Sequence, residues 1–140
     1  MAYAAVADLI ARFGVRELIQ LTDRAEPPTD QVDDAVACIA LNAASQIVDS
    51  HVSVKYNLPL AQVDPLLVDI TCDIARFRLY STQATELVIE RNKQALESLK
   101  RIAAGTMKID VGGVEPESRT TVILAQSDPR RFSRRTERNG

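Results

Sequence analysis

The sequence contains few side chains of the kinds that bind metals or catalyse reactions, and their spacing does not suit either role. His51 is the only histidine; it lies near Asp49 and Lys55, with no second histidine or cysteine at metal-ligand spacing. We interpret it as a surface or interface residue. Cys38 and Cys72 are far apart, and each falls in a helical pattern among apolar neighbours, where a reduced thiol acts as a small hydrophobe. We therefore expect neither a metal site nor a redox pair.

The sequence also lacks the common arrangements for catalysis and nucleotide binding. Neither Ser45 nor Ser50 lies in the Gly-x-Ser-x-Gly turn that exposes the nucleophile of a hydrolase. Gly112-Gly113 follows the predicted helices and precedes acidic residues, which would repel a phosphate. Asp69 and Asp73 are spaced for one helical face, as solvated surface charges often are. We predict no enzymatic activity and no cofactor.

The one unusual group of residues lies near the C-terminus. Guanidinium groups bind carboxylates or phosphates in a bidentate manner, and a single Phe is a typical apolar anchor of an interface. The candidate docking residues are Arg130, Arg131, Phe132, Arg134 and Arg135. Three interpretations stay open: a solvated tail, an arm that docks onto an acidic protein surface, and an arm that contacts DNA.

The net charge of −2 conceals an asymmetry between the two parts of the chain. Residues 129–140 carry five Arg against one Glu, which leaves −6 for residues 1–128. An acidic body with a basic end suggests a charged arm that reaches for a partner. No apolar run approaches the roughly 18 residues needed to cross a bilayer, and residues 1–13 lack the basic start of a signal peptide. We expect a cytosolic protein with no membrane contact.

The elements that must position these residues are predicted to be helices. The 140 residues are 46% hydrophobic but only 4% aromatic, which suits one domain with a core of Ala, Leu, Ile and Val. Apolar residues recur at helical spacing in five segments. The expected helices cover about residues 4–13, 15–21, 30–56, 65–81 and 85–105, with Thr29 or Asp30 capping the third and Asp64 capping the fourth.

The third helix is predicted to be the spine of the domain. At about 25 residues it would be roughly 38 Å long. Its small residues leave room for a neighbouring helix to approach closely. The apolar face is expected to contain Val32, Ala35, Val36, Ile39, Ala43, Ile47 and Val52.

The predicted fold class is mainly α, a small bundle of four to five helices with an extended C-terminal arm. Residues 1–105 form the helical body and residues 106–140 the arm, which could span on the order of 110 Å if fully stretched. The alternation of residues from Met107 to Val111 is typical of a short β segment, and Thr120 to Leu124 is a second candidate.

Several segments, in order along the chain, together resemble one family. Residues 7–14 with 17–23 are similar to the start of the small neck proteins of Mu-like phages and prophages. The loop Tyr56-Asn57-Leu58-Pro59-Leu60, residues 72–80 and the Arg-x-Phe-Ser-Arg ending at residues 130–134 resemble the same family. These segments cover nearly the whole chain. The polar last residues, 135–140, depart from the more hydrophobic ending of that family.

The resemblance implies a phage head–tail connector, also called an adaptor or head-completion protein. Such a protein forms a homo-oligomeric ring, commonly a dodecamer, beneath the portal protein, and its C-terminal segment docks onto the portal. The implied partners are the portal, a downstream neck or tail-completion protein, and double-stranded DNA that passes without sequence specificity. The implied location is the virion neck, assembled in the cytoplasm of the bacterial host. Separately from the resemblance, the candidate contacts between subunits or of the loops are Leu58, Pro59, Leu60, Met107, Ile109 and Val111. Leu58 and Leu60 bracket a proline and are expected to pin their loop onto the body.

A second function of a different class stays open. A helical DNA-binding or regulatory module could use the same basic tail to hold phosphates. It would bind duplex DNA tightly and with strong salt dependence, whereas the acidic body of a connector should bind duplex weakly.

Overall fold

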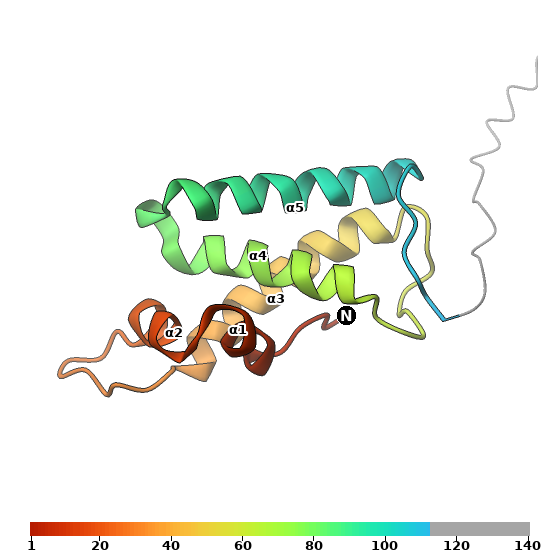
Figure 1. Cartoon of the computed structure of the whole chain (residues 1–140). Coiled ribbons are helices and arrows are strands. Elements are labelled where there is room, and N and C mark those ends of the chain that lie inside the picture. Colours follow the sequence, from red (N-terminus) through yellow and green to blue (C-terminus); the bar gives the residue numbers. More distant parts are fainter. Residues whose placement is uncertain (113–140) are drawn as a thin grey trace, which may run out of the picture.

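Five α-helices form the part of the chain that the structure, a computed structural model, describes, which is residues 1–112 (Figure 1). They are α1 (Val6–Phe13), α2 (Val15–Thr22), α3 (Asp34–Val52), α4 (Pro65–Tyr80) and α5 (Glu86–Ala104), with a short 3-10 turn, η1 (Ser81–Gln83), before α5. The predicted mainly helical fold is confirmed. The expected strand at Thr120–Leu124 lies outside the described residues.

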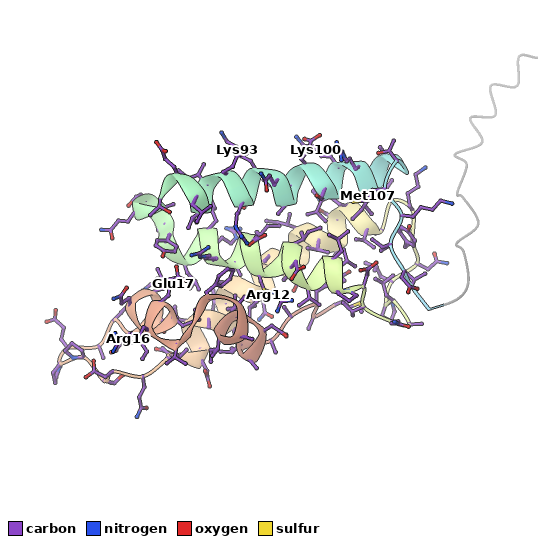
Figure 2. All side chains as sticks on the ribbon, in the orientation of Figure 1. Arg12, Arg16, Glu17, Lys93, Lys100 and Met107 are labelled. Atoms are coloured by element: carbon purple, nitrogen blue, oxygen red, sulfur yellow. The ribbon has the colours of Figure 1, made fainter. Side chains whose placement is uncertain are left out.

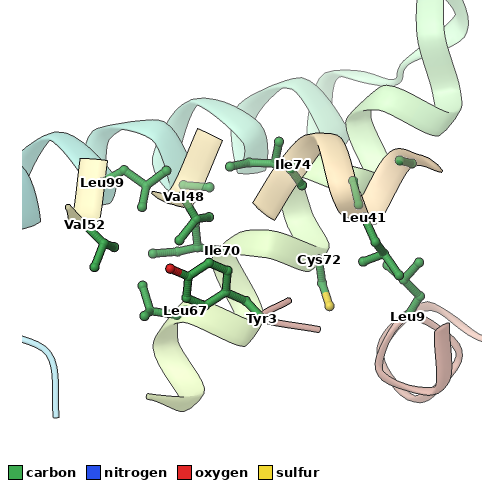
Figure 3. Packing of buried hydrophobic residues seen from close by; sticks show 14 of the residues in the cluster. Tyr3, Leu9, Leu41, Val48, Val52, Leu67, Ile70, Cys72, Ile74 and Leu99 are labelled. Atoms are coloured by element: carbon green, nitrogen blue, oxygen red, sulfur yellow. The ribbon is translucent and has the colours of Figure 1, made fainter. Parts of the chain in front are cut away.

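Helices α3 and α4 form the centre of the bundle, because each of them packs against all four other helices. Helix α5 runs antiparallel along one side of α4, α3 crosses α4 obliquely, and α1 and α2 lie on the side away from α5 (Figure 1). A helix covered on several sides must be apolar around most of its circumference. The buried residues of α4 fit this requirement: they are Leu67, Ile70, Thr71, Cys72, Ile74, Ala75 and Leu79 (Figure 3).

Local signals in the sequence set several helix boundaries as predicted. The Asp64 carboxylate accepts a hydrogen bond of 2.8 Å from the backbone N–H of Leu66, and Pro65 occupies the first helical position, where no N–H is needed. Gly105 ends α5 in the left-handed conformation at φ 81°, which glycine adopts without steric cost. These boundaries depend only on neighbouring residues.

The prediction that Thr29 or Asp30 caps the long helix is wrong. Both residues instead donate their backbone N–H groups to the Asp23 carboxylate, which holds them in the loop between α2 and α3. The cap is Asp33, whose carboxylate accepts from the N–H groups of the second and third helical residues. The backbone N–H of Asp33 in turn donates to the Thr22 hydroxyl at 2.9 Å, which fixes where α3 begins.

The end of α3 and its buried face also differ from the prediction. The helix stops at Val52, so its 19 residues span about 28 Å. Ile39, expected in the core, is 71% exposed. The buried residues are Ala37, Ala40, Leu41, Ala44, Ser45, Val48 and Val52 (Figure 3). The three alanines present the smallest side chains to the neighbouring helices, and close packing at that crossing selects this face.

Helix α3 is unusually apolar for a helix that has one exposed face. By length and composition α3 is apolar enough to cross a membrane, a test that the core helix of a soluble protein also passes, and 39% of its most apolar window is buried. The expectation of no membrane contact stays a prediction.

The expected β segment at Met107–Val111 is wrong, because this stretch has no strand partner within residues 1–112 and is irregular. Its backbone amides bond to side chains instead. The N–H of Ile109 donates to the Tyr56 hydroxyl at 3.2 Å, and the N–H of Asp110 donates to the Asp64 carboxylate at 2.7 Å. The segment therefore packs on the helical body, and the predicted division into body and arm at residue 105 stays a prediction.

A single charged cluster fastens α2 to α4. The Arg76 guanidinium lies 2.7 Å from the Glu17 carboxylate and 4.3 Å from the centroid of the Phe13 ring, and the Tyr80 hydroxyl donates to the same carboxylate. The hydrogen bond to Glu17, together with burial, raises the pKa of Tyr80. The Arg76 and Glu17 side chains are only 15% and 18% exposed, so the pair is shielded from most of the solvent.

We predict that Arg76→Ala lowers the free energy of unfolding by about 2 kcal/mol, because it leaves the largely buried Glu17 carboxylate without its cation. Chemical denaturation followed by circular dichroism measures the change. Arg12→Ala is the matched control: it removes the more exposed ion pair with Asp69 and should cost less than about 1 kcal/mol. Equal effects of the two substitutions would contradict a special role for the Arg76 cluster.

Candidate functional site

The sequence-predicted site residues divide into two groups. The docking residues Arg130, Arg131, Phe132, Arg134 and Arg135 lie outside the described residues, so their role stays a prediction. The predicted loop contacts come together at one end of the bundle. Leu60 and Ile109 are buried there and Pro59 is exposed, while Leu58, Met107 and Val111 are half-buried against the core. Five of these six side chains thus pack within their own subunit, and their contact with a neighbour stays a prediction.

The same end of the molecule carries a concentration of positive charge, which we call the basic end. It consists of Lys55, Lys100, Arg101 and Lys108. A side chain built at Gly105 would lie 3.5 Å from Cε of Lys55, which places that lysine beside the end of α5. Lys100 lies on the last turns of α5, at the end that also carries Met107 (Figure 2). The two carboxylates in the same segments, Asp64 and Asp110, accept backbone hydrogen bonds.

The opposite end of the bundle is acidic, and its main feature is the loop between α2 and α3, which projects away from the helices (Figure 1). Residues 23–34 contain five carboxylates and one Arg; the carboxylates are Asp23, Glu26, Asp30, Asp33 and Asp34, and we call them the acidic end. Residues 24–31 are all exposed. Packing against the body therefore does little to shape this loop.

One carboxylate organises the acidic loop from within. The Asp23 side chain accepts hydrogen bonds from the backbone N–H groups of Ala25, Thr29 and Asp30, and from the Thr29 hydroxyl. Desolvation is the largest single contribution and opposes ionisation, but the four hydrogen bonds together outweigh it and lower the pKa of Asp23. Because loops that are ordered without body contacts are commonly functional, we interpret the projection as a preformed interaction element.

The exposed face of α3 that begins at the acidic end carries no charge. From Ala35 to Val48 the helix has no charged residue, although 26% of the whole chain is charged. The exposed residues in this stretch are Ala35, Cys38, Ile39, Asn42 and Gln46. The exposed face of α5 is different, because most of its residues are charged: Glu86, Glu90, Arg91, Lys93, Glu97, Lys100 and Arg101. Leu87 and Ile89 are also exposed, at the start of this helix. An uncharged face with an exposed Ile suits a partner, whereas the mixed charge along the rest of α5 suits water.

The remaining polar groups show structural roles. Asp73, predicted as a solvated charge, is half-buried; desolvation raises its pKa, and Arg91 at 3.7 Å opposes the rise. Among residues 1–112, no three His, Cys, Asp or Glu side chains lie close enough together to hold a metal ion. The Nδ1 atom of His51 lies 2.8 Å from the Ile47 carbonyl oxygen of its own helix. These groups support the helices and do not converge on a reacting position.

The two cysteines, both expected to act as small hydrophobes among apolar neighbours, differ in environment. Cys72 is fully buried, and desolvation by burial raises the pKa of its thiol to about 12. Cys38 is exposed on the uncharged face of α3, because that face is turned away from the core.

In the sequence, the run Glu26-Pro27-Pro28-Thr29-Asp30 indicates a turn between helices, because its prolines cannot continue a helix. It does not reveal that Asp23 orders the turn from outside it. The signal that could have found the site is the local density of carboxylates, five within twelve residues.

Comparison with known proteins gives one family match and two similar phage or prophage proteins. The model of the family described as "Bacteriophage Mu, Gp36" matches residues 3–125 of the chain. The chain is 35% identical over 142 residues to "Gene product J" of Escherichia phage Mu, covering 96% of each protein. It is also 31% identical over 107 residues to "Mu-like prophage FluMu protein gp36" of Haemophilus influenzae, covering 76% of this chain and 74% of the relative.

Replacing Asp23 should loosen the acidic loop without unfolding the bundle. In Asp23→Asn we expect amide hydrogen exchange at Thr29 and Asp30 to become roughly tenfold faster or more, because the uncharged amide is a weaker acceptor. Glu26→Gln removes the same charge from the same loop and should leave both amides protected. Unchanged exchange in Asp23→Asn would contradict the role of this carboxylate.

The lowered pKa of Asp23 makes the order of the loop depend on pH. The carboxylate is ionised more readily in the folded chain, so its stabilisation is complete above the ordinary pKa, about 4, and is lost as the pH falls through the lowered value. Amide exchange at Thr29 and Asp30, corrected for intrinsic rates, should therefore show full protection at pH 5 and less at pH 2. Protection that falls between pH 7 and pH 5 would be inconsistent with this assignment.

The two cysteines should differ in reactivity. Ellman's reagent should label Cys38 in the native protein and Cys72 only after denaturation, because the thiolate is the reactive form and Cys72 is both buried and hard to ionise. The Cys38→Ser variant serves as the control and should show no labelling until it is unfolded. Rapid labelling of that variant under native conditions would mean that Cys72 is accessible.

Proposed function

Because the chain belongs to the Bacteriophage Mu Gp36 family, we propose that it is a head–tail connector, a non-enzymatic subunit of a ring in the neck of a Mu-like phage particle. Family membership over nearly the whole chain is the observation that carries this proposal. The ordered resemblance of its segments to phage neck proteins supports the more specific role.

The shape and surface of the helical body support a role in assembly. A closed ring needs heterologous contacts, in which one surface of each subunit meets a different surface of the next. The body offers unlike surfaces for this purpose: an acidic projecting loop, an uncharged helix face and a basic end. The proposed ring is twelvefold, to match the portal above it.

The proposed portal contact is the C-terminal arm. Its candidate docking residues are Arg130, Arg131, Phe132, Arg134 and Arg135, in which Phe132 is an apolar anchor and the guanidinium groups pair with carboxylates of the portal. The other side of the ring would meet a downstream neck or tail-completion protein. Both contacts would form in the host cytoplasm and persist in the virion.

The acidic charge of residues 1–128 supports a conduit for DNA. Carboxylates on the wall of a channel repel phosphates, so double-stranded DNA would pass without adhering and without sequence readout. A DNA-binding or regulatory module, the alternative function, would instead hold phosphates with the basic tail and would have to overcome the repulsion from this acidic body.

Truncation of the chain after Asp128 tests the arm directly. We expect it to abolish the joining of heads to tails in a phage that depends on this protein, because the docking residues are removed. Circular dichroism should show an unchanged helical body. Electron microscopy of particles and of the protein mixed with portal gives the readout: separate heads and tails, and portals without an added ring.

A chain that ends at Arg138 is the matched control for this truncation. It loses only the last two residues, keeps all five docking residues, and should join heads to tails normally. Unimpaired joining by the shorter, Asp128-terminated chain would refute the docking role of the arm. Tight, salt-sensitive binding of duplex DNA by the full chain would favour the DNA-binding alternative.

A further inference from the structure

We infer that the acidic end of one copy docks on the basic end of the next, so that chains associate head to tail. This inference rests on the proposed function, because it names the contact from which the proposed ring is built. It commits to a second copy of this chain as the occupant of both surfaces. Opposite local charge at the two ends of one molecule is the observation that carries it.

The acidic end presents its charge in a form suited to docking. The Asp23 carboxylate is used internally to hold the loop, and Asp33 caps α3, whereas Glu26 and Asp30 are exposed on the projection and Asp34 on the first turn of α3. Because the loop is already ordered, association does not have to pay a large entropy cost for fixing it. Three carboxylates therefore face a partner in a preset arrangement.

The basic end supplies complementary charge from separate segments that the fold brings together. Lys55 comes from the turn after α3, Lys100 and Arg101 from the last turns of α5, and Lys108 from the segment that follows. The carbonyl oxygens at the end of α5 add partial negative charge, which the same cations offset. Lysine and arginine side chains can reach across a surface to carboxylates on a projecting loop.

Each end also carries one exposed apolar residue among its charges. Ile39 lies one turn into α3, next to the acidic end, and is 71% exposed. Val54 directly precedes Lys55 and is 52% exposed. Interfaces commonly have an apolar centre within a polar rim, and in such a contact the charges set register and specificity while the apolar residues add affinity.

The two ends cannot meet within one chain. The α2–α3 loop projects at one end of the long axis of the bundle, and the α3–α4 loop and the end of α5 lie at the other (Figure 1). A contact between unlike surfaces is heterologous, so it generates a ring if the rotation closes and a filament if it does not. Contact between the ends therefore has to be intermolecular.

Zero-length crosslinking can detect the contact in the full-length protein. A carbodiimide joins carboxylates to lysine amines that touch. Chains labelled with ¹⁴N and ¹⁵N are mixed, and mass spectrometry identifies joined peptides of mixed isotope, which only intermolecular contacts produce. We expect mixed pairs between residues 23–34 and Lys55, Lys100 or Lys108, weakening as salt increases. Cys38, beside Ile39, should lose reactivity toward thiol reagents as the chains associate.

Charge reversal tests the same contact by sedimentation at low salt. Glu26→Lys halves the net charge of residues 23–34, from −4 to −2, and Lys100→Glu halves the positive charge of the basic end, from +4 to +2, so each variant alone should self-associate roughly tenfold more weakly than the native chain. An equimolar mixture of the two should recover association, with Glu26→Lys and Lys100→Glu chains joined to each other. Glu90→Lys and Lys93→Glu are the matched controls on exposed positions of mid-α5 and should associate like the native chain.

The outcomes separate this inference from the proposed function. A native chain that stays monomeric up to millimolar concentration, or crosslinks only through other surfaces, overturns the inference while head–tail joining by the intact protein can still succeed. Failure of the intact protein to join heads to tails overturns the proposed function, even where the isolated chains associate end to end. Equal weakening by Lys93→Glu and Lys100→Glu also overturns the inference.

Discussion

The structure depends on the burial of α4 on almost every side. Because apolar residues surround this helix, from Leu67 to Leu79, each of the other four helices has to cover part of it. The inner faces of α3 and α5 are buried against α4, and only their outer faces are available to partners. The outer face of α5 is mostly charged, apart from Leu87 and Ile89 near its start. The uncharged outer face of α3, which includes Ile39, is apolar beyond what the core uses, and this excess supports the proposed role in assembly.

The ends of the bundle are fixed by polar contacts, because the loops there bury little apolar surface. The Asp23 carboxylate accepts hydrogen bonds from backbone amides of the α2–α3 loop. The Asp64 carboxylate both caps α4 and accepts a hydrogen bond from the amide of Asp110. A backbone hydrogen bond fixes a carboxylate in place but leaves its charge. At the basic end, four cations outnumber the two carboxylates Asp64 and Asp110, so positive charge dominates the field there.

The sequence was sufficient for features that depend on adjacent residues and insufficient for those that depend on distant ones. The Asp64-Pro65 start of α4 and the Gly105 end of α5 were predictable because cap and helix are neighbours in the chain. The start of α3 was not, because Asp23 binds the amides of Thr29 and Asp30 from outside the segment. The buried face of α3 was ambiguous because apolar residues lie nearly all round it, and packing selected the alanines. The strand expected at Met107–Val111 required a partner strand, and periodicity alone cannot supply one. The carboxylates of the acidic end are clustered in the sequence itself, whereas the basic end became visible only once the fold had placed its separate segments together.

The net acidity of residues 1–128 does not oppose association between copies as strongly as the total charge suggests. At physiological ionic strength the Debye length is about 8 Å, so a charge on one subunit interacts mainly with charges within the contact itself. Helix α5 alone is about 28 Å long, which is more than three screening lengths, so in an end-to-end contact the carboxylates far from the contact would be screened from those of the next copy. Across the proposed contact between the two ends, the near charges are opposite in sign. In the proposed ring the remaining acidity would face outward or line the channel, where it would discourage adhesion to nucleic acid without weakening the contacts between subunits.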